Sequence, residues 1–202
     1  MNQEHIANIS QDDSFAQTID WSPCKKGGAS YKSRDLVETR LERLEYKPVF
    51  IAKLIPGIFL LNGFCIAFGS LAFPALVQGG NLVPILFGSF TFGLGFFAWR
   101  WMNYPIYFDL QRKFASIGYQ EEKVRFDDIY AIQLIPETVT QSSRSHGRRR
   151  TRRYRSYRSY ELNLVLKNSQ RVNVVDHGKL DAIRQDAQLL AKLIEVPVWD
   201  GI

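Results

Sequence analysis

The chain has long stretches without charge and few cysteines or histidines, and each shortage excludes a class of protein. Its 202 residues include only two cysteines and three histidines, so a disulfide-stabilised scaffold is excluded. No charged residue and no histidine occurs from Leu54 to Trp99. No acidic residue occurs between Glu137 and Glu161. These two gaps mark regions of different chemistry.

Averages over the whole chain hide these regions. A mean hydropathy of −0.18 and a formal net charge of +6 are typical of a basic soluble domain. Eight of the 26 basic residues, however, are arginines between positions 144 and 158. Without these eight, 18 basic residues would face 20 acidic ones. The basicity is therefore a local property, as is the hydrophobicity.

The uncharged run of 46 residues predicts two membrane-spanning helices. The hydrocarbon layer of a bilayer takes about 20 helical residues to cross. The turn at 78–81 contains two glycines and an asparagine, so within 54–102 we expect helices at about 55–76 and 82–102. A buried hairpin in a soluble domain is the alternative. It is disfavoured because neither segment carries a polar stripe.

Charge predicts the orientation of this hairpin. Lys47 and Lys53 precede it and Arg100 and Arg112 follow it, whereas the turn carries no charge. Because positive flanks stay on the cytoplasmic side, a multi-pass protein with both termini cytoplasmic is expected. Small residues four apart occur in both segments, as in the pair Gly63 and Ala67 and the pair Ser89 and Gly93. Such spacing favours close helix packing, either within the hairpin or between copies in an oligomer.

The rest of the chain indicates an α+β fold. Residues 1–30 are polar and predict a flexible tail. Residues 31–53 fit two short strands packing on the β-domain or one helix, and the alternation over 43–47 favours strands. In 103–202 several strand-like segments precede an amphipathic helix at 179–195. A small antiparallel β-domain closed by a C-terminal helix is the order of a pleckstrin-homology-like (PH-like) barrel, here cytoplasmic.

Three short segments, Phe108–Lys113, Ile129–Gln133 and Ala187–Pro197, carry a resemblance to known proteins. Together with the two membrane helices they resemble the two-helix photosystem I assembly protein family. The layout is also similar to that of uncharacterised bacterial two-helix inner-membrane proteins with a PH-like cytoplasmic domain. The N-terminal 50 residues and the arginine-rich segment do not match. The resemblance implies a bacterial inner (cytoplasmic) membrane location and a scaffold, assembly or regulatory role with an unknown protein partner.

The arginine-rich segment is the sharpest local signal, and it is predicted to be a loop over 144–158 between two strands. Its guanidinium groups suit bidentate contacts with phosphates. Anionic lipid headgroups are the expected ligand, RNA or DNA is the alternative, and a solvated loop is the third interpretation. The candidate phosphate-binding residues are Arg144, Arg148, Arg149, Arg150, Arg152, Arg153, Arg155 and Arg158.

Catalytic patterns are not recognisable in the sequence. The histidines His5, His146 and His177 lie in the tail, in the arginine-rich segment and before the final helix. Asp176 and His177 are interpreted as a helix cap and turn rather than as an acid–base pair. We therefore expect no catalytic residue, no cofactor and no metal site, and a protein that is not an enzyme.

Overall fold

A computed structural model describes residue 9 and residues 12–39, 42–73, 82–118, 123–144 and 152–202. The chain divides into two compact units. One, here the β-unit, contains Met1–Tyr46 and Ile106–Ile202, and the other, here the hairpin unit, contains Lys47–Pro105. The α+β class is confirmed, because the described residues form three α-helices and two β-sheets. The PH-like assignment stays a prediction.

The hairpin unit consists of helices α2 (Phe50–Ala72) and α3 (Val83–Met102). Both are long and apolar enough to cross a membrane, and only 11% of the most apolar stretch of each helix is buried. Helix α2 begins five residues before the expected start, so Pro56 lies inside the helix rather than in its first turn. The expected end at 76 lies outside the described residues. Pro84 lies in the first turn of α3, where a missing N–H group costs nothing.

Glycines set the packing of α2 against α3. A Cβ atom on Gly63 would clash with the backbone of Phe92, and one on Gly88 would clash with the backbone of Ala67. Gly93 has open space around its missing Cβ. The pair Gly63 and Ala67 therefore packs the hairpin together, whereas Gly93 does not contribute to this contact. An oligomer through the outer helix faces stays a prediction.

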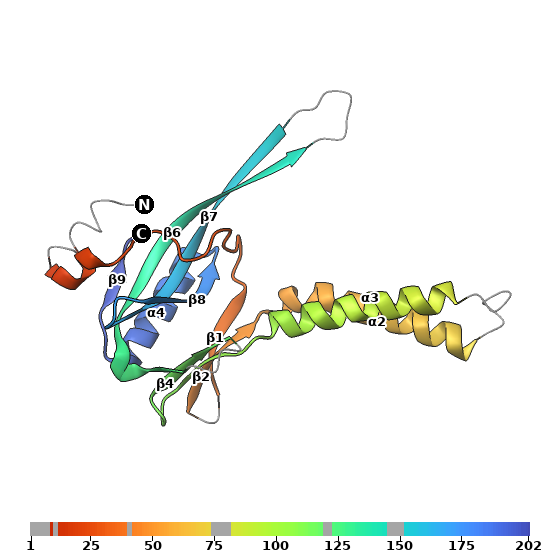
Figure 1. Cartoon of the computed structure of the whole chain (residues 1–202), viewed down its shortest axis with the longest axis horizontal. Helices are drawn as coiled ribbons and strands as arrows, with labels where there is room; N and C mark the ends of the chain where they lie inside the picture. Colours follow the sequence, from red (N-terminus) through yellow and green to blue (C-terminus); the bar gives the residue numbers. More distant parts are fainter. Residues whose placement is uncertain (1–8, 10–11, 40–41, 74–81, 119–122, 145–151) are drawn as a thin grey trace. The chain divides into compact units, whose positions relative to one another are not determined.

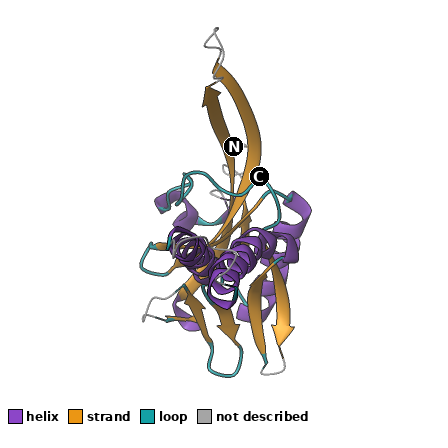
Figure 2. Ribbon diagram, turned by 90° about the vertical axis from the view of Figure 1, so that its right-hand side faces the viewer, coloured by secondary structure: helices purple, strands orange, loops and turns teal. Residues whose placement is uncertain are grey.

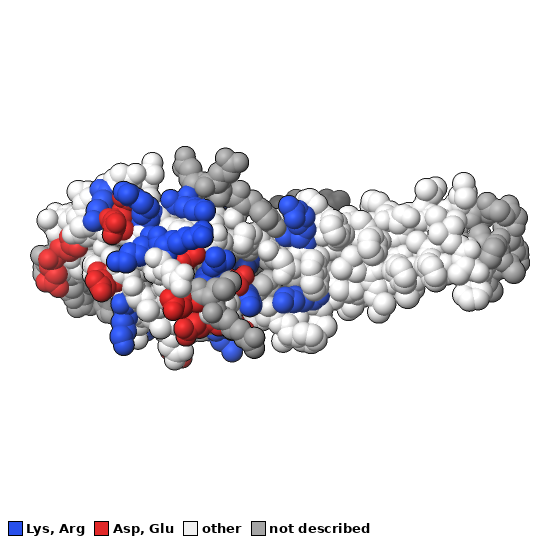
Figure 3. Space-filling model, turned by 90° about the horizontal axis from the view of Figure 1, so that it is seen from below, with Lys and Arg blue, Asp and Glu red and all other residues white. Residues whose placement is uncertain are grey.

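The hairpin satisfies its polar side chains locally. Asn62 Nδ2 donates to the carbonyl of Ile58, and the Thr91 hydroxyl donates to the carbonyl of Phe87, each one turn earlier in the same helix. Charge is confined to the end where α2 begins and α3 ends, where Lys53 and Arg100 lie. The rest of the described hairpin surface is uncharged (Figure 3). A segment with this distribution has no polar surface to present to water over most of its length.

The first sheet of the β-unit has the strand order β1-β2-β3-β4-β5. Its strands are β1 (Arg34–Thr39), β2 (Arg43–Pro48), β3 (Ile106–Asp109), β4 (Phe114–Ile117) and β5 (Val124–Arg125). Strands β2 and β3 pair antiparallel with Leu44 opposite Phe108, although the helical hairpin separates them in the sequence. The sequence favoured two strands within 31–53, and β1 and β2 lie there.

The second sheet has the order β8-β7-β6-β9. Its strands are β6 (Ile129–Arg144), β7 (Arg152–Leu166), β8 (Arg171–His177) and β9 (Val198–Asp200). A purely antiparallel β-domain was expected, but β9 pairs parallel with β6, with Trp199 opposite Gln133. Three residues carry too little alternation to be recognised as a strand, and the preceding helix makes the parallel return possible.

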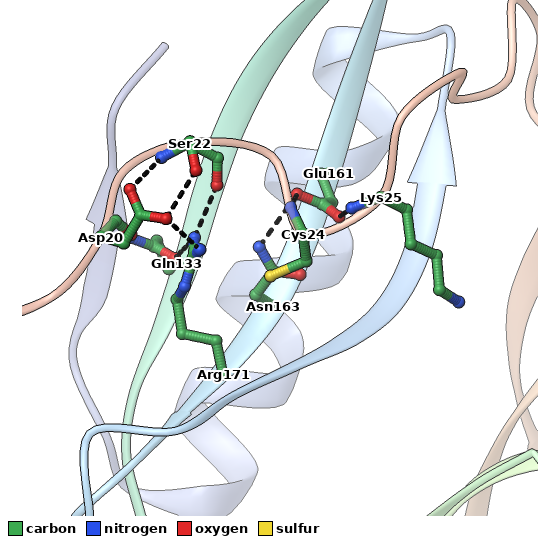
Figure 4. Close-up of polar contacts among 8 residues, drawn as sticks. All are labelled: Asp20, Ser22, Cys24, Lys25, Gln133, Glu161, Asn163 and Arg171. Atoms are coloured by element: carbon green, nitrogen blue, oxygen red, sulfur yellow. Dashed lines mark hydrogen bonds and ion pairs between the residues drawn. The ribbon is translucent and has the colours of Figure 1, made fainter.

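Helix α4 (Leu180–Ile194) packs on the second sheet against β6, β7 and β8. Its buried face includes Ile183, Ala187 and Leu190, which have no exposed surface. The sequence predicted this helix at 179–195. Short 3₁₀-helices occur at η1 (Ser14–Thr18) and η4 (Phe126–Asp128). Figure 4 shows α4 behind β6 and β7 and an N-terminal segment in front of them, so the sheet is covered on both faces.

Candidate functional site

Strands β6 and β7 continue together beyond the rest of their sheet. Pairing of β7 with β8 ends at Tyr160, and pairing of β6 with β9 ends at Leu134. From there the two strands pair with each other as far as Arg144 and Arg152. We call residues 137–144 and 152–159 the ribbon, and Figures 1 and 2 show it projecting from the sheet.

The ribbon carries arginine on both faces. Arg155 and Arg158 are exposed and lie three residues apart on β7, so their side chains leave opposite faces of the strand. Tyr154 is 63% exposed. The partner strand offers neutral residues opposite these positions, since Thr138 pairs with Arg158 and Gln141 pairs with Arg155. Each face therefore presents an exposed arginine whose directly opposite residue is neutral.

The predicted loop over 144–158 is wrong in its bounds. Arg144 is the last residue of β6, while Arg152, Arg153, Arg155 and Arg158 belong to β7. Arg148, Arg149 and Arg150 lie outside the described residues. The strand forms because β6 places uncharged residues across from most of the β7 arginines, which avoids repulsion between like charges in opposite positions.

The segment of residues 13–28, which begins with η1 and continues as irregular backbone, crosses the second sheet and is here called the strap. The buried Glu161 carboxylate accepts hydrogen bonds from the backbone N–H of Cys24, at 2.8 Å, and of Lys25, at 3.0 Å. Glu137 accepts from the N–H of Gly27, at 2.9 Å, and of Gly28, at 3.0 Å. The two carboxylates thus accept hydrogen bonds from four backbone N–H groups within five residues of the strap.

Other side chains of the sheet bind the carbonyls of the strap. The Tyr157 hydroxyl donates to the carbonyl of Gly28 at 3.0 Å, and Gln133 Nε2 donates to that of Asp20 at 3.2 Å. Arg171 donates to the carbonyl of Ser22 at 2.7 Å and to the Asp20 carboxylate at 2.9 Å (Figure 4). A flexible tail was expected over 1–30, and within it residues 13–28 lie against the second sheet with partners distant in sequence.

The floor beneath the strap is polar and buried. Glu161 is 2% exposed and Asn163 is fully buried. Asn173 Nδ2 donates to Glu161 at 2.8 Å and to Asp176 at 3.1 Å. Burial raises the pKa of the Asp176 carboxyl, and the hydrogen bond from Asn173 opposes this shift. Burial, followed by the nearby Glu161 charge, also raises the pKa of the Cys24 thiol.

The sequence did not single out this site. Glu137 and Glu161 were noted only as the limits of the segment without acids. Their strap partners lie more than 100 residues away, and no local pattern relates such positions. The Lys25–Gly28 stretch lacks the spacing of a phosphate loop. Here Gly27 adopts a positive φ of 87°, and the missing side chain of Gly28 allows the backbone to lie against Ser159.

His177 occupies a second buried polar position. The cap and turn predicted for Asp176 and His177 is wrong, because both residues lie in β8 and Lys179 is the residue preceding α4. His177 is fully buried, with Nε2 3.3 Å from the Asp186 carboxylate. Burial, followed by the Asp186 charge, raises the pKa of the Tyr46 hydroxyl well above its ordinary value. These residues join β2, β8 and α4 in the interior of the β-unit.

Within the described ranges no group of three or more His, Cys, Asp or Glu side chains is placed to hold a metal ion. No family model, curated protein or solved structure matches the chain. A functional proposal for this chain therefore has to rest on its own residues.

Proposed function

We propose that the chain is a membrane-anchored scaffold, without catalytic activity, whose β-unit contacts the phosphates of anionic lipid headgroups through the ribbon. The carrying observation is the pair of exposed arginines, Arg155 and Arg158, on a projecting strand of a chain that also holds two apolar helices. Each basic residue near an anionic membrane surface contributes about 1 kcal/mol of attraction. Two engaged arginines would therefore strengthen binding roughly 30-fold.

Chain connectivity supports the membrane setting. A single residue, Val49, joins β2 to α2, and three residues join α3 to β3. Any membrane that the hairpin crosses is therefore a few residues of chain from the β-unit. A short tether raises the effective concentration of lipid phosphate that the ribbon encounters. Two β-sheets followed by a C-terminal helix also support the PH-like interpretation, and a partner protein would complete the scaffold role.

Vesicle binding by the full chain tests the lipid contact. The protein is held in nanodiscs of neutral phosphatidylcholine and mixed with floated vesicles of phosphatidylcholine alone or with phosphatidylglycerol. We expect binding to the anionic vesicles only, and a roughly 30-fold loss for the double variant Arg155→Gln and Arg158→Gln. The matched control is Lys179→Gln with Lys192→Gln, which removes the same charge from exposed positions elsewhere.

Two results contradict the lipid contact. Equal recovery on neutral and anionic vesicles would exclude a role of headgroup charge. An equal loss in the control variant would show that net charge, not the ribbon, determines binding. The nanodisc with the unaltered protein serves as the reference in both cases.

The shape of the ribbon favours one alternative, a membrane-tethered nucleic-acid-binding protein. A two-stranded ribbon fits the major groove of a duplex, and a groove surrounds both faces of the ribbon, where Arg155 and Arg158 lie. This function predicts filter binding of a DNA or RNA duplex whose affinity falls steeply with salt. Binding of the duplex in preference to anionic vesicles, lost in the double arginine variant, would replace the lipid proposal.

Orientation is tested with the native cysteines. We propose that both termini face the cytoplasm of a bacterial inner membrane, with Cys24 on that side and Cys65 within α2. A membrane-impermeant maleimide should then label Cys24 in inverted membrane vesicles and not in intact spheroplasts. Labelling in spheroplasts would reverse the orientation. The Cys65→Ser variant keeps the signal specific to Cys24.

A further inference from the structure

The two halves of the strap rest on different floors. Residues 13–21, here the anchor, bury Ala16 and Ile19 against Ala131, Val165 and Trp199. Residues 22–28, here the latch, lie on polar side chains of β6, β7 and β8, with Glu137 and Glu161 as the main acceptors. The anchor is held mainly by burial of apolar side chains, whereas the latch is held mainly by hydrogen bonds.

Main-chain atoms of the latch make most of these contacts. Glu161 and Glu137 bind backbone N–H groups, while Tyr157 and Arg171 bind backbone carbonyls. Because these floor residues bind the backbone of the latch, the contacts do not depend on the identity of most latch side chains. A peptide that presents its N–H and C=O groups in the same bent arrangement, with glycines in the places of Gly27 and Gly28, would meet the same partners.

The polarity of the floor is costly for a permanent cover. Glu161, Asn163 and Ser159 are each at most 2% exposed. Burial of a carboxylate and of amide groups costs free energy that an apolar floor would not incur. The cost is avoided whenever the latch leaves and water reaches the floor. A polar floor is thus what a surface needs if it is uncovered for part of the time.

One buried hydroxyl of the floor is unsatisfied while the latch is in place. Ser159 is 1% exposed, and its Oγ has no hydrogen-bond partner among the described residues. It faces Gly28 so closely that a Cβ on this glycine would clash with it. A buried hydroxyl without a partner is destabilising. A different peptide whose backbone supplies a donor or acceptor here would fit the floor better than the latch does.

We propose that the floor of Glu137, Ser159, Glu161, Asn163 and Asn173 is a binding groove for a basic, glycine-containing peptide of a partner protein, and that the latch occupies this groove until the peptide displaces it. The carboxylates of Glu137, Glu161 and Asp176 favour a peptide with positive charge. The latch carries Lys25 and Lys26 together with two glycines, and it is the template for the ligand. A glycine is required over Ser159, because a side chain there would clash.

Cys24 reports on the latch directly. Its thiol pKa is raised in the closed latch, so release should return the pKa toward its ordinary value and raise the reaction rate with a maleimide. For each unit by which the thiol pKa falls, the thiolate fraction rises tenfold but each thiolate reacts more slowly, so the maleimide rate rises about threefold. The full chain with Cys65→Ser, in neutral detergent micelles, provides one reactive thiol.

The probe is a synthetic peptide with the sequence of residues 22–30 and serine in place of Cys24. We expect the Cys24 rate to rise saturably with this peptide. The matched control is the same peptide with Gly28→Val, which keeps the charge but clashes with Ser159, and it should have no effect. In the chain, Gly28→Val should raise the basal rate and tighten binding of the labelled peptide, because the internal competitor is lost.

Glu161→Gln separates the groove from the latch. It removes the charged acceptor of two N–H groups, so labelled peptide should bind more weakly even where Gly28→Val has already released the latch. Slow hydrogen exchange at Ala16 and Ile19 confirms that a variant still holds its anchor and is folded. The proposal is overturned if the labelled peptide binds neither the native chain nor the folded Gly28→Val variant.

A second copy of the chain is the competing occupant. In that case the basal Cys24 rate would depend on protein concentration, and the latch of one chain would occupy the groove of another. That result would replace the partner peptide by a strap exchange between copies. The experiment uses no anionic lipid, so its failure is distinguishable from failure of the lipid contact.

Discussion

The two units of this protein place large apolar side chains in opposite positions, inside the β-unit and on the surface of the hairpin unit. In the β-unit the large side chains Phe108 and Leu164 are fully buried. In the hairpin unit Phe97 is 72% exposed, while Gly63 and Gly88 are buried at the helix contact. The β-unit excludes apolar side chains from water, whereas the hairpin presents them outward and joins its helices through backbone contact. Such an inverted arrangement suits a hydrocarbon solvent, in which apolar burial gives no advantage.

The difference predicts opposite sensitivities to side-chain size. A core filled with large residues is weakened when a side chain becomes smaller, because a cavity remains. A helix pair joined through glycines is weakened when a side chain becomes larger, because the backbones must separate. The following variants test this contrast.

The largest effect is expected in the core of the β-unit. Leu164→Ala should lower the free energy of unfolding by about 2–5 kcal/mol, because Leu164 is fully buried. Urea unfolding of the full chain in detergent, followed by the near-ultraviolet signal of the β-unit tryptophans, measures this loss. The counterpart Leu61→Ala, at a position 64% exposed on α2, should leave the midpoint nearly unchanged. Similar losses in both variants would contradict the contrast.

A smaller effect is expected from enlarging a glycine in the hairpin. Gly63→Val should destabilise the α2–α3 contact by about 1–3 kcal/mol, because its side chain would collide with the backbone of Phe92. Gly69→Val is the matched control, since no atom lies within 4 Å of the Cβ position there. Hydrogen exchange of the helix amides in detergent measures the difference. Equal exchange in the two variants would show that α2 and α3 do not pack through Gly63.

A third contrast concerns pH, which between pH 3 and pH 8 should act on the β-unit because residues 54–99 hold no Asp, Glu, Lys, Arg or His. The hydrogen bond from the backbone N–H of Arg112 lowers the pKa of Asp109 below its ordinary value of 3.8, and the Arg43 guanidinium lowers it further. Burial opposes this shift with a smaller effect. Burial raises the pKa of Asp176. The ionised form is thus favoured by folding at Asp109 and disfavoured at Asp176.

These directions predict opposite mutants. The stability from Asp109 is present above pH 3.8 and is lost as the pH falls through its lowered pKa, so Asp109→Asn should destabilise at pH 7. The stability cost at Asp176 appears as the pH rises through its raised pKa, so Asp176→Asn should stabilise at pH 7 and have no advantage below pH 3.8. Thermal unfolding between pH 3 and pH 8 measures both. A loss of stability in Asp176→Asn at pH 7 would reverse the assignment.

The smallest effect is expected at an exposed ion pair of the β-unit. Arg125 Nε lies 3.1 Å from the Asp128 carboxylate, with both side chains largely in water. Water and salt screen such a pair, so Arg125→Gln should change the melting temperature less than Leu164→Ala, Gly63→Val or Asp109→Asn does. Melting in low and high salt measures the change. A loss comparable with that of Leu164→Ala would mean that polar surface contacts, rather than the core, hold the β-unit together.

Local patterns predicted the elements whose cause is local. The uncharged run located α2 and α3, although Phe50–Lys53 extended α2 at its start. The apolar spacing from Leu180 to Ile194 located α4 within one residue at each end. In these segments the composition of about 15 to 20 consecutive residues decides the conformation, so no distant partner is needed.

Distant partners decided what the sequence did not reveal. The Ser22–Gly28 stretch has no regular pattern, and its order depends on Glu137, Tyr157 and Glu161 of the second sheet. The arginine-rich segment was predicted to be a loop over 144–158 because it lies between two predicted strands, yet the neutral β6 partner made pairing favourable. Sites built from residues more than 100 positions apart leave no spacing to recognise.

The sequence by itself determined that this protein has an apolar helical hairpin, a local arginine-rich segment and a C-terminal amphipathic helix, because each follows from neighbouring residues. Only the tertiary structure decided that Arg155 and Arg158 lie on opposite faces of a ribbon and that the N-terminal strap is held on a buried polar floor. The physical reason is that strand pairing and buried hydrogen bonds join groups far apart along the chain, and their free energy exists only once the chain has folded.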